Sequence, residues 1–421
     1  TDSTLLLPTT ITSTTEVKTN KISPATGTAF ALGDSGDTFT VPSGATIVNS
    51  GTSTGFGDSL RPNANPFIIN GGMEVDQRTA AAAAVFTNNA YGIDRWLNYL
   101  NGSWAGNYQQ IDRSNSVVTD LQTDSSKNFG NVMMIDCTSA ASLGATDLVG
   151  VLQPIEGYVH NPMAGKAITL SFWVRSTLTG IYCVAFKQGG VKTYVVEYTI
   201  SSADTWEQKI ITLTDDTLAN YSSNTSTTNG SSLQLYFGVR LGTTAQQTTA
   251  DAWNVGNFYG TSNQVTWGTS TSDFFYLAGV QIEMGTYTSA TLPPFQFESF
   301  GNNLSRCLRY YQKSYAYASV VGTNTDVGLR TTSGSAGGLT TGYLYGDIEW
   351  QVNMRAAPTV TTYDKYNGTP GVCSRLNGGV ARTDAQNISA AGITEKNCTI
   401  NSTGTANAGA IDVHWRAVAE L

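Results

Sequence analysis

The sequence has few charged residues. Asp, Glu, Lys and Arg make up 13% of its 421 residues, against about 25% in an average globular protein. Because Lys, Glu and Arg are strong helix formers, their scarcity beside abundant Thr, Ser, Asn and Gly excludes a helical bundle or a coiled coil. Thr, Val and the aromatic residues suit the half-buried faces of β-sheets. The composition therefore predicts an all-β fold.

Basic residues are fewer than acidic residues in this chain. The chain carries 23 Lys and Arg residues against 31 Asp and Glu residues, a formal net charge of −8. Nucleic-acid-binding proteins need clustered Lys and Arg, and no run of five basic residues occurs here, so we expect no nucleic-acid partner. No apolar run approaches the roughly 18 residues that span a bilayer, so we expect no membrane insertion.

Cysteine and histidine are too sparse for the common metal and catalytic motifs. The five cysteines have no C-x-x-C spacing, which predicts buried thiols in a protein made in a reducing compartment. The two histidines, His160 and His414, do not form a zinc motif, and His414 lies in an alternating pattern typical of a structural histidine. No G-x-S-x-G, P-loop or H-E-x-x-H motif occurs. We therefore expect no catalytic residues and no cofactor.

Residues 1–62 differ from the rest of the chain. They are rich in Thr, Ser and Gly, and their only aromatic residues are Phe30, Phe39 and Phe56. So few apolar side chains cannot build an independent core. The segment is therefore either a disordered tail or a stalk whose strands pack against other copies of the chain, and we favour the stalk.

Residues 63–300 show the pattern of a β-sandwich. In AITLSFWVRS, the apolar residues Ile168, Leu170, Phe172 and Val174 alternate with their neighbours. Further strand candidates (GIYCVAFKQ, TYVVEYTI, WEQKIITLT, LQLYFGVRL and FFYLAGVQIEMG) follow at intervals of about 10–20 residues, as is typical of a sandwich or jelly roll. The run Ala80–Ala84 is the one helix-like stretch, although a loop would also fit it. Three tryptophans in strand patterns are predicted to lie in the core: Trp96, Trp173 and Trp206.

Residues 301–421 are predicted to form a second β domain, a sandwich. Short strand patterns alternate there with Gly-rich turns, and AIDVHWRAVAEL is predicted to be the closing strand. The pair Pro293-Pro294 just upstream is predicted to be the linker between the two domains.

Several segments resemble bacteriophage tail-fibre and receptor-binding proteins, of the type found in marine and cyanobacterial phages. NPFIINGGMEVDQR, followed by YGIDRWLNYLNG with Asp94-Arg95-Trp96, resembles the opening of a fibre module. LSFWVRS, TWEQKIITL and FFYLAGVQIEMG resemble strands of a carbohydrate-binding jelly roll, and SATLPPFQFESFGNNLSRCLRYYQKSY resembles the junction to a C-terminal domain. The segments ITSTTEVKTNKISPATG and GDTFTVPSGATIVNSGTSTGFG are similar to attachment and shaft segments.

The resemblance implies a homotrimeric virion protein, made in the host cytoplasm. Residues 1–62 would attach it to a tail, baseplate or head protein. Residues 63–300 would form the jelly roll, and residues 301–421 would form the receptor-binding tip. The implied function is adhesion to a host-surface glycan. Two alternatives stay open: a structural head fibre or decoration protein without a specific receptor, and a polysaccharide depolymerase, whose paired carboxylates would leave no local pattern.

Aromatic residues among polar neighbours are the candidate sugar-binding platforms, because an aromatic face stacks on a pyranose ring. Packing at a subunit interface is an equally good explanation for them. In the jelly roll and the tip, the candidates are Trp104, Tyr108, Trp253, Tyr259, Trp267, Tyr343, Tyr345, Tyr363 and Tyr366. The resemblance also allows a structural calcium ion, for which the candidate ligands are Asp215, Asp216 and Asp273, although a solvated turn explains the first two as well.

Overall fold

A computed structural model describes residues 66–121, 129–188, 192–213, 229–333, 344–377, 380–402 and 410–421. The predicted stalk, residues 1–62, lies outside the described residues, and the domain boundaries predicted from the sequence stay predictions. None of the helices in the described ranges is long and apolar enough to cross a membrane.

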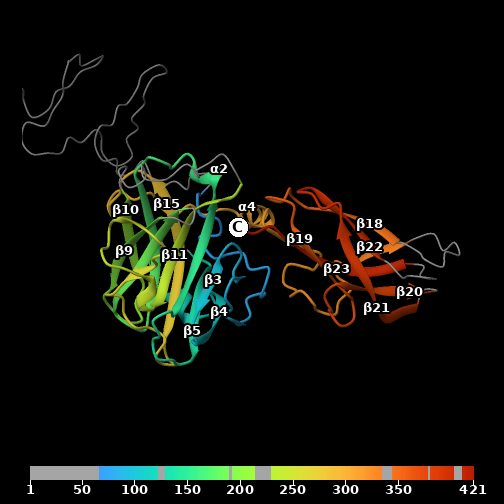
Figure 1. Ribbon diagram of the computed structural model, residues 1–421, viewed down its shortest axis with the longest axis horizontal. Helices are drawn as coiled ribbons and strands as arrows, with labels where there is room; N and C mark the ends of the chain where they lie inside the picture. Colours follow the sequence, from blue (N-terminus) through green and yellow to red (C-terminus); the bar gives the residue numbers. More distant parts are fainter. Residues whose placement is uncertain are drawn as a thin grey trace, which may run out of the picture. The chain divides into compact units, whose positions relative to one another are not determined.

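Two antiparallel sheets pack face to face (Figure 1). In the order of their pairing, the described strands of the first sheet are β1 (Ala84–Val85), β4 (Ala105–Asp112), β5 (Asn131–Ser139), β15 (Phe274–Met284), β7 (Ile168–Ser176) and β10 (Glu207–Leu213). Those of the second sheet are β13 (Trp253–Val255), β9 (Lys192–Ile200), β8 (Gly180–Gln188), β11 (Ser231–Leu241), β6 (Leu148–Glu156), β3 (Leu97–Asn101) and β2 (Ala90–Tyr91). A short parallel pair, β12 (Gln246–Gln247) and β14 (Gly260–Thr261), lies in a connecting loop.

The main core lies between these two sheets. The alternation predicted for 168–174 is confirmed, because Ile168, Leu170, Phe172 and Val174 of β7 are all fully buried. Phe172 meets Phe237 of the second sheet edge to face, with ring centroids 5.0 Å apart. Each such buried aromatic or aliphatic side chain contributes about 1.5–3 kcal/mol to the free energy of folding. The predicted all-β sandwich is confirmed.

A third antiparallel sheet is built by the C-terminal part of the chain and is coloured orange to red in Figure 1. Its described strands are β16 (Tyr311–Lys313), β17 (Arg330–Ser333), β18 (Leu344–Glu349), β19 (Thr359–Tyr363), β20 (Val372–Asn377), β21 (Val380–Ala391), β22 (Asn397–Ser402) and β23 (Ala410–Val418). The predicted closing strand is confirmed as β23. It pairs with β16, β17, β19 and β20, so it is central to this sheet.

The described helices are short: α1 (Ser116–Leu121), α2 (Gly157–His160), α4 (Phe300–Leu308) and the 3-10 turn η1 (Thr243–Ala245). The Ala80–Ala84 run is not a helix, and the alternative of a loop is confirmed for Ala80–Ala83. Ala80 and Ala81 have φ of 55° and 62° in a turn, and Ala84 begins β1. Helix α4 instead begins after Ser299, whose hydroxyl accepts a hydrogen bond from the Asn302 N–H, as N-cap residues do.

All five cysteines are free and buried, which confirms the prediction of buried thiols. Burial raises the pKa of the Cys183 and Cys398 thiols to about 11, so both remain protonated at neutral pH.

Candidate functional site

Residues of the segments 65–78 and 91–102 meet where the sandwich contacts the C-terminal sheet, and we call this region the joint. Asp94 is buried there and accepts hydrogen bonds from the backbone N–H and the side-chain amide of Gln77, at 2.6 and 3.0 Å. Asn70 donates to the carbonyls of Val75 and Asp94, at 2.9 and 3.0 Å. Burial raises the pKa of Asp94 to about 6. These polar groups bind each other rather than solvent.

Arg95 completes the joint. It is only 1% exposed; its guanidinium pairs with Glu420 and donates to the Pro154 carbonyl at 2.7 Å. Arg78 pairs with the same carboxylate at 2.7 Å and lies 3.9 Å from the ring centroid of Tyr311. Because the two guanidinium groups share one buried carboxylate, the Asp-Arg-Trp motif connects parts of the protein and offers no free charge to a ligand.

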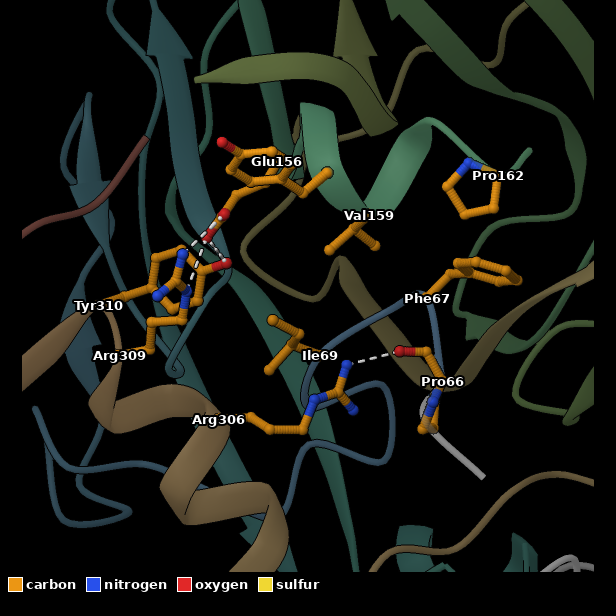
Figure 2. A pocket seen from close by; sticks show the side chains of 10 residues that line it. Pro66, Phe67, Ile69, Glu156, Val159, Pro162, Arg306, Arg309 and Tyr310 are labelled. Carbon is orange, nitrogen blue, oxygen red and sulfur yellow. Dashed lines mark hydrogen bonds and ion pairs between the residues drawn. The ribbon is translucent and has the colours of Figure 1, made fainter. Parts of the chain in front are cut away.

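A pocket of about 470 Å³ opens beside the joint, and we call it the junction pocket (Figure 2). At one end, the carboxylate of Glu156 accepts hydrogen bonds from Arg309 Nε and Nη2, at 3.1 and 3.0 Å, and from the Tyr310 hydroxyl, at 2.5 Å. The rest of the lining is mostly apolar, and the residues are Pro66, Phe67, Ile69, Glu156, Tyr158, Val159, Pro162, Arg306, Arg309 and Tyr310.

A second hollow, of about 240 Å³, lies on the outer face of the first sheet, and we call it the Trp173 groove. Trp173 of β7 is half-buried and stands directly opposite Gln208 of β10 in the strand register. The chain that follows β15 forms the other wall. The lining residues are Phe129, Ser171, Trp173, Gln208, Gly279, Ser289, Leu292, Pro293, Pro294 and Phe295.

The Pro293-Pro294 pair is part of this wall. The side-chain amide of Gln281 in β15 donates to the carbonyls of Pro293 and Pro294, at 3.3 and 3.5 Å, and accepts from the Gln296 N–H at 2.8 Å. Hydrogen bonds therefore attach this segment to the first sheet. That it also separates two domains stays a prediction.

Five of the aromatic residues predicted as exposed platforms are buried: Trp104, Tyr108, Tyr259, Trp267 and Tyr363. Trp104 and Trp267 pack on each other with ring centroids 5.6 Å apart. The expectation that these five rings are exposed is wrong, because residues distant in the sequence cover them.

Two of the remaining candidates are less enclosed. Trp253 is half-buried and packs against Tyr194, with centroids 5.5 Å apart. Tyr366 is half-buried, and the Lys365 ammonium lies 5.3 Å from its ring centroid. Tyr343 lies outside the described residues, as does the side chain of Tyr345, whose backbone belongs to β18. A binding role for these residues stays a prediction.

Sequence reasoning missed Trp173 by assigning all three strand tryptophans to the core. Trp96 is fully buried, as predicted, whereas Trp173 and Trp206 are half-buried. Successive side chains of a strand point to opposite faces. Since Phe172 belongs to the core-facing set, the alternation itself places Trp173 on the outer face, and that signal was available in the sequence.

The predicted calcium ligand Asp273 caps a loop. Its Oδ2 atom accepts hydrogen bonds from the backbone N–H groups of Gly268, Thr269 and Ser270, at 2.9, 3.1 and 3.1 Å. Within the described ranges, no three His, Cys, Asp or Glu side chains are grouped so that they could hold a metal ion. Asp215 and Asp216 lie outside the described residues.

Both histidines are buried and bonded to serine hydroxyls. His160 Nδ1 lies 2.8 Å from Ser232 Oγ, and His414 Nδ1 lies 2.9 Å from Ser314 Oγ. His414 Nε2 also lies 2.9 Å from the Thr325 carbonyl, which confirms the prediction of a structural histidine. Burial lowers the pKa of His160 to about 4. Neither histidine lines the junction pocket or the Trp173 groove.

No protein-family model matches the sequence, and no curated protein matches it either. Among solved structures, the chain is similar to the enzymatically active domain of tailspike protein 4 of bacteriophage CBA120, with 12% identity and a TM-score of 0.26 over 52% of this chain. That match spans only 21% of the tailspike chain.

Two other similar structures are matched over nearly their whole length. The family 11 carbohydrate-binding module of a Clostridium thermocellum cellulase has 13% identity and a TM-score of 0.24, over 50% of this chain and 98% of that one. Discoidin II of Dictyostelium discoideum has 11% identity and a TM-score of 0.17, over 75% of this chain and 94% of that one.

Proposed function

We propose that this protein is a bacteriophage tail-fibre protein that binds a glycan on the host surface. The fibre assignment rests on the order of the family-like segments along the chain. The binding assignment is carried by one observation: a half-buried indole, Trp173, lines a groove together with amide and hydroxyl side chains.

The chemistry of the groove suits a sugar. A pyranose has an apolar face of C–H groups, for which the flat ring of Trp173 is a partner held in place by its strand. Gln208, Ser171 and Ser289 offer donors and acceptors for the sugar hydroxyls. No charged side chain occurs among the described residues that line the groove, which favours a neutral, hydroxyl-rich glycan.

We infer binding without hydrolysis. Cleavage of a glycosidic bond normally uses two carboxyl groups about 5–10 Å apart, and the described lining of the Trp173 groove contains neither Asp nor Glu. The groove therefore supports an adhesin better than a depolymerase.

The proposal includes assembly into a homotrimer that is made in the host cytoplasm and carried on the virion. Residues 1–62 attach it to a tail, baseplate or head protein. Three identical binding sites on one particle give avidity on a surface that displays many copies of one glycan. A weak single site is then sufficient for adhesion.

The test is binding of the full chain to glycans extracted from host cells, with Trp173→Ala as the key variant. We expect about a tenfold or greater loss of affinity, the equivalent of about 1.4 kcal/mol, while Trp173→Phe keeps most of the binding because it retains a stacking face. The control is Val255→Ala, since Val255 is 73% exposed on β13 and lies in neither hollow. Unchanged binding by a correctly folded Trp173→Ala variant would contradict the proposal.

A further inference from the structure

The junction pocket is distinct from the Trp173 groove and has a different chemical character. Three chain segments line it: the residues around Phe67, the β6–α2 turn at Glu156 and Tyr158, and helix α4 with Arg309. Figure 2 shows Ile69, Val159 and Phe67 around the cavity, with Arg309 beside Glu156 and Arg306 reaching towards Pro66. Its volume of about 470 Å³ falls within the range of small-molecule sites.

The apolar part of the pocket is accessible. Phe67 and Val159 are half-buried, and Tyr158 is 59% exposed at the rim. An exposed tyrosine ring and a half-buried phenylalanine in one pocket lining offer aromatic surface for the C–H face of a small ligand.

The polar part of the pocket offers guanidinium donors, and the one carboxylate in its described lining is engaged within the protein. Both carboxylate oxygens of Glu156 already accept hydrogen bonds from Arg309 or Tyr310. The Pro66 carbonyl accepts from Arg306 Nη2 at 2.5 Å. Arg309, whose side chain is 38% exposed, has no partner for its Nη1 group among the described residues. The guanidinium N–H groups only donate, whereas the hydroxyls of Tyr158 and Tyr310 can also accept.

The charges at the pocket are balanced. Arg309 pairs with Glu156 at 3.0 Å, and Arg306 pairs with Glu298 at 2.7 Å. An anionic ligand would gain little attraction from two guanidinium groups whose charges are already neutralised. A ligand rich in hydroxyl groups would compete for few acceptors, the Tyr158 and Tyr310 hydroxyls and the already hydrogen-bonded Glu156, at a cost of about 1–3 kcal/mol for each donor left unpaired.

We propose that the junction pocket binds the acetyl group of an acetylated sugar. An acetyl group combines a methyl group, which suits Ile69, Val159 and Phe67, with an uncharged carbonyl oxygen, which can accept from Arg309. This assignment rests on the proposed glycan-binding function and adds to it the class of substituent that is recognised at a second site.

The experiment measures binding of two small probes to the full chain by saturation-transfer NMR and titration. The probes are methyl 2-acetamido-2-deoxy-β-glucoside and methyl β-glucoside. They differ only at C2, which carries an acetamido group in the first probe and a hydroxyl group in the second. We expect the acetamido sugar to bind with a dissociation constant on the order of 1 mM, with the strongest transfer to its acetyl methyl. We expect the plain glucoside to bind at least tenfold more weakly.

Val159→Asn introduces polar atoms into the apolar floor and should weaken binding of the acetamido sugar at least fivefold. The matched control is Val255→Asn, which makes the same substitution on β13 and should leave the affinity unchanged. Thermal unfolding of each variant checks the fold, and Tyr158→Ser, at the exposed rim, provides a second pocket variant that does not disturb the core. Equal binding of the two probes, no detectable binding, or unchanged affinity in both pocket variants would each overturn the inference.

The Trp173→Ala variant separates this inference from the proposed function. It should still bind the acetamido sugar at the junction pocket while losing affinity for the host glycan. If host-glycan binding depends on Trp173 but the acetamido sugar does not bind, the inference fails and the proposed function stands. If neither ligand binds the wild-type chain, both fail.

Discussion

The guanidinium carbon of Arg95 lies 3.5 Å from the ring centroid of Tyr310. Arg95 comes from the loop before β3, and Tyr310 lies between α4 and β16. The same guanidinium pairs with Glu420 beyond β23, so one buried cation joins three segments that are far apart in the sequence. The joint therefore connects the sandwich to the C-terminal sheet through charge as well as through apolar packing.

Replacement of Arg95 by Met should be strongly destabilising. It leaves Glu420 with one cation instead of two and removes the donor to the Pro154 carbonyl, at an expected cost of about 2–4 kcal/mol in the free energy of unfolding. Urea denaturation measures this loss. Arg175→Met is the control, since its partners Asp120 and Asp204 are more than half exposed and it should cost less than about 1 kcal/mol. Equal losses in the two variants would contradict the role of the joint.

His160 should make the protein less stable in acid. Burial lowers its pKa to about 4 from an ordinary value of 6.5, so between these pH values the unfolded chain binds a proton that the folded chain does not. This contribution to stability is complete above pH 6.5 and declines as the pH falls towards 4, by about 3 kcal/mol.

Comparison with His160→Gln isolates this effect, since Gln can still bond to Ser232 but does not titrate. The free energies of unfolding of the two proteins must be subtracted because Asp94 acts in the opposite direction. Its raised pKa makes the folded chain more stable as the pH falls from about 6 to 4, in both proteins alike. Urea unfolding at several pH values measures the difference. A wild-type curve parallel to that of the variant would show that His160 is not titrating as expected.

Gly279→Ala should destabilise the first sheet and distort the Trp173 groove. Gly279 has a φ of +59° at the bulge in β15, and an added Cβ would lie 2.4 Å from the Phe129 ring. Backbone strain and the displaced ring should together cost about 2–4 kcal/mol. Gly371→Ala is the control, because Gly371 also has positive φ but no atom within 4 Å of an added Cβ. If thermal unfolding shows that both variants lose the same stability, the contact with Phe129 does not contribute to the destabilisation.

Adhesion should depend little on salt. The Trp173 groove has no charged side chain in its described lining, so raising the ionic strength from about 0.05 to 0.5 M, which shortens the range of electrostatic interactions, should change host-cell binding by less than about twofold. Adsorption of labelled full-length chain to host cells measures this. A loss of tenfold or more would indicate a charged receptor instead of a neutral glycan.

The strands and their inward faces could be predicted from the sequence. In β7, apolar residues at every second position could bury together only on one face of a sheet, and the structure has that arrangement. The same alternation at every second position also predicted β23. Helix α4 was not predicted because the overall composition favours strands, although Ser299 as N-cap and the spacing of Leu304, Cys307 and Leu308 are local helix signals.

Strand alternation could place Trp173 on the outer face, but the burial of Trp104 was decided by tertiary structure. Trp104 lies among polar neighbours in the sequence, yet Trp267 and Phe86 cover it. The sequence determined the sandwich because alternating apolar residues must all be buried on one face, which is a local property of each strand. Which remaining rings reach solvent, and which charges meet Arg95 and Glu420, depends on contacts between residues hundreds of positions apart, and no local pattern encodes those.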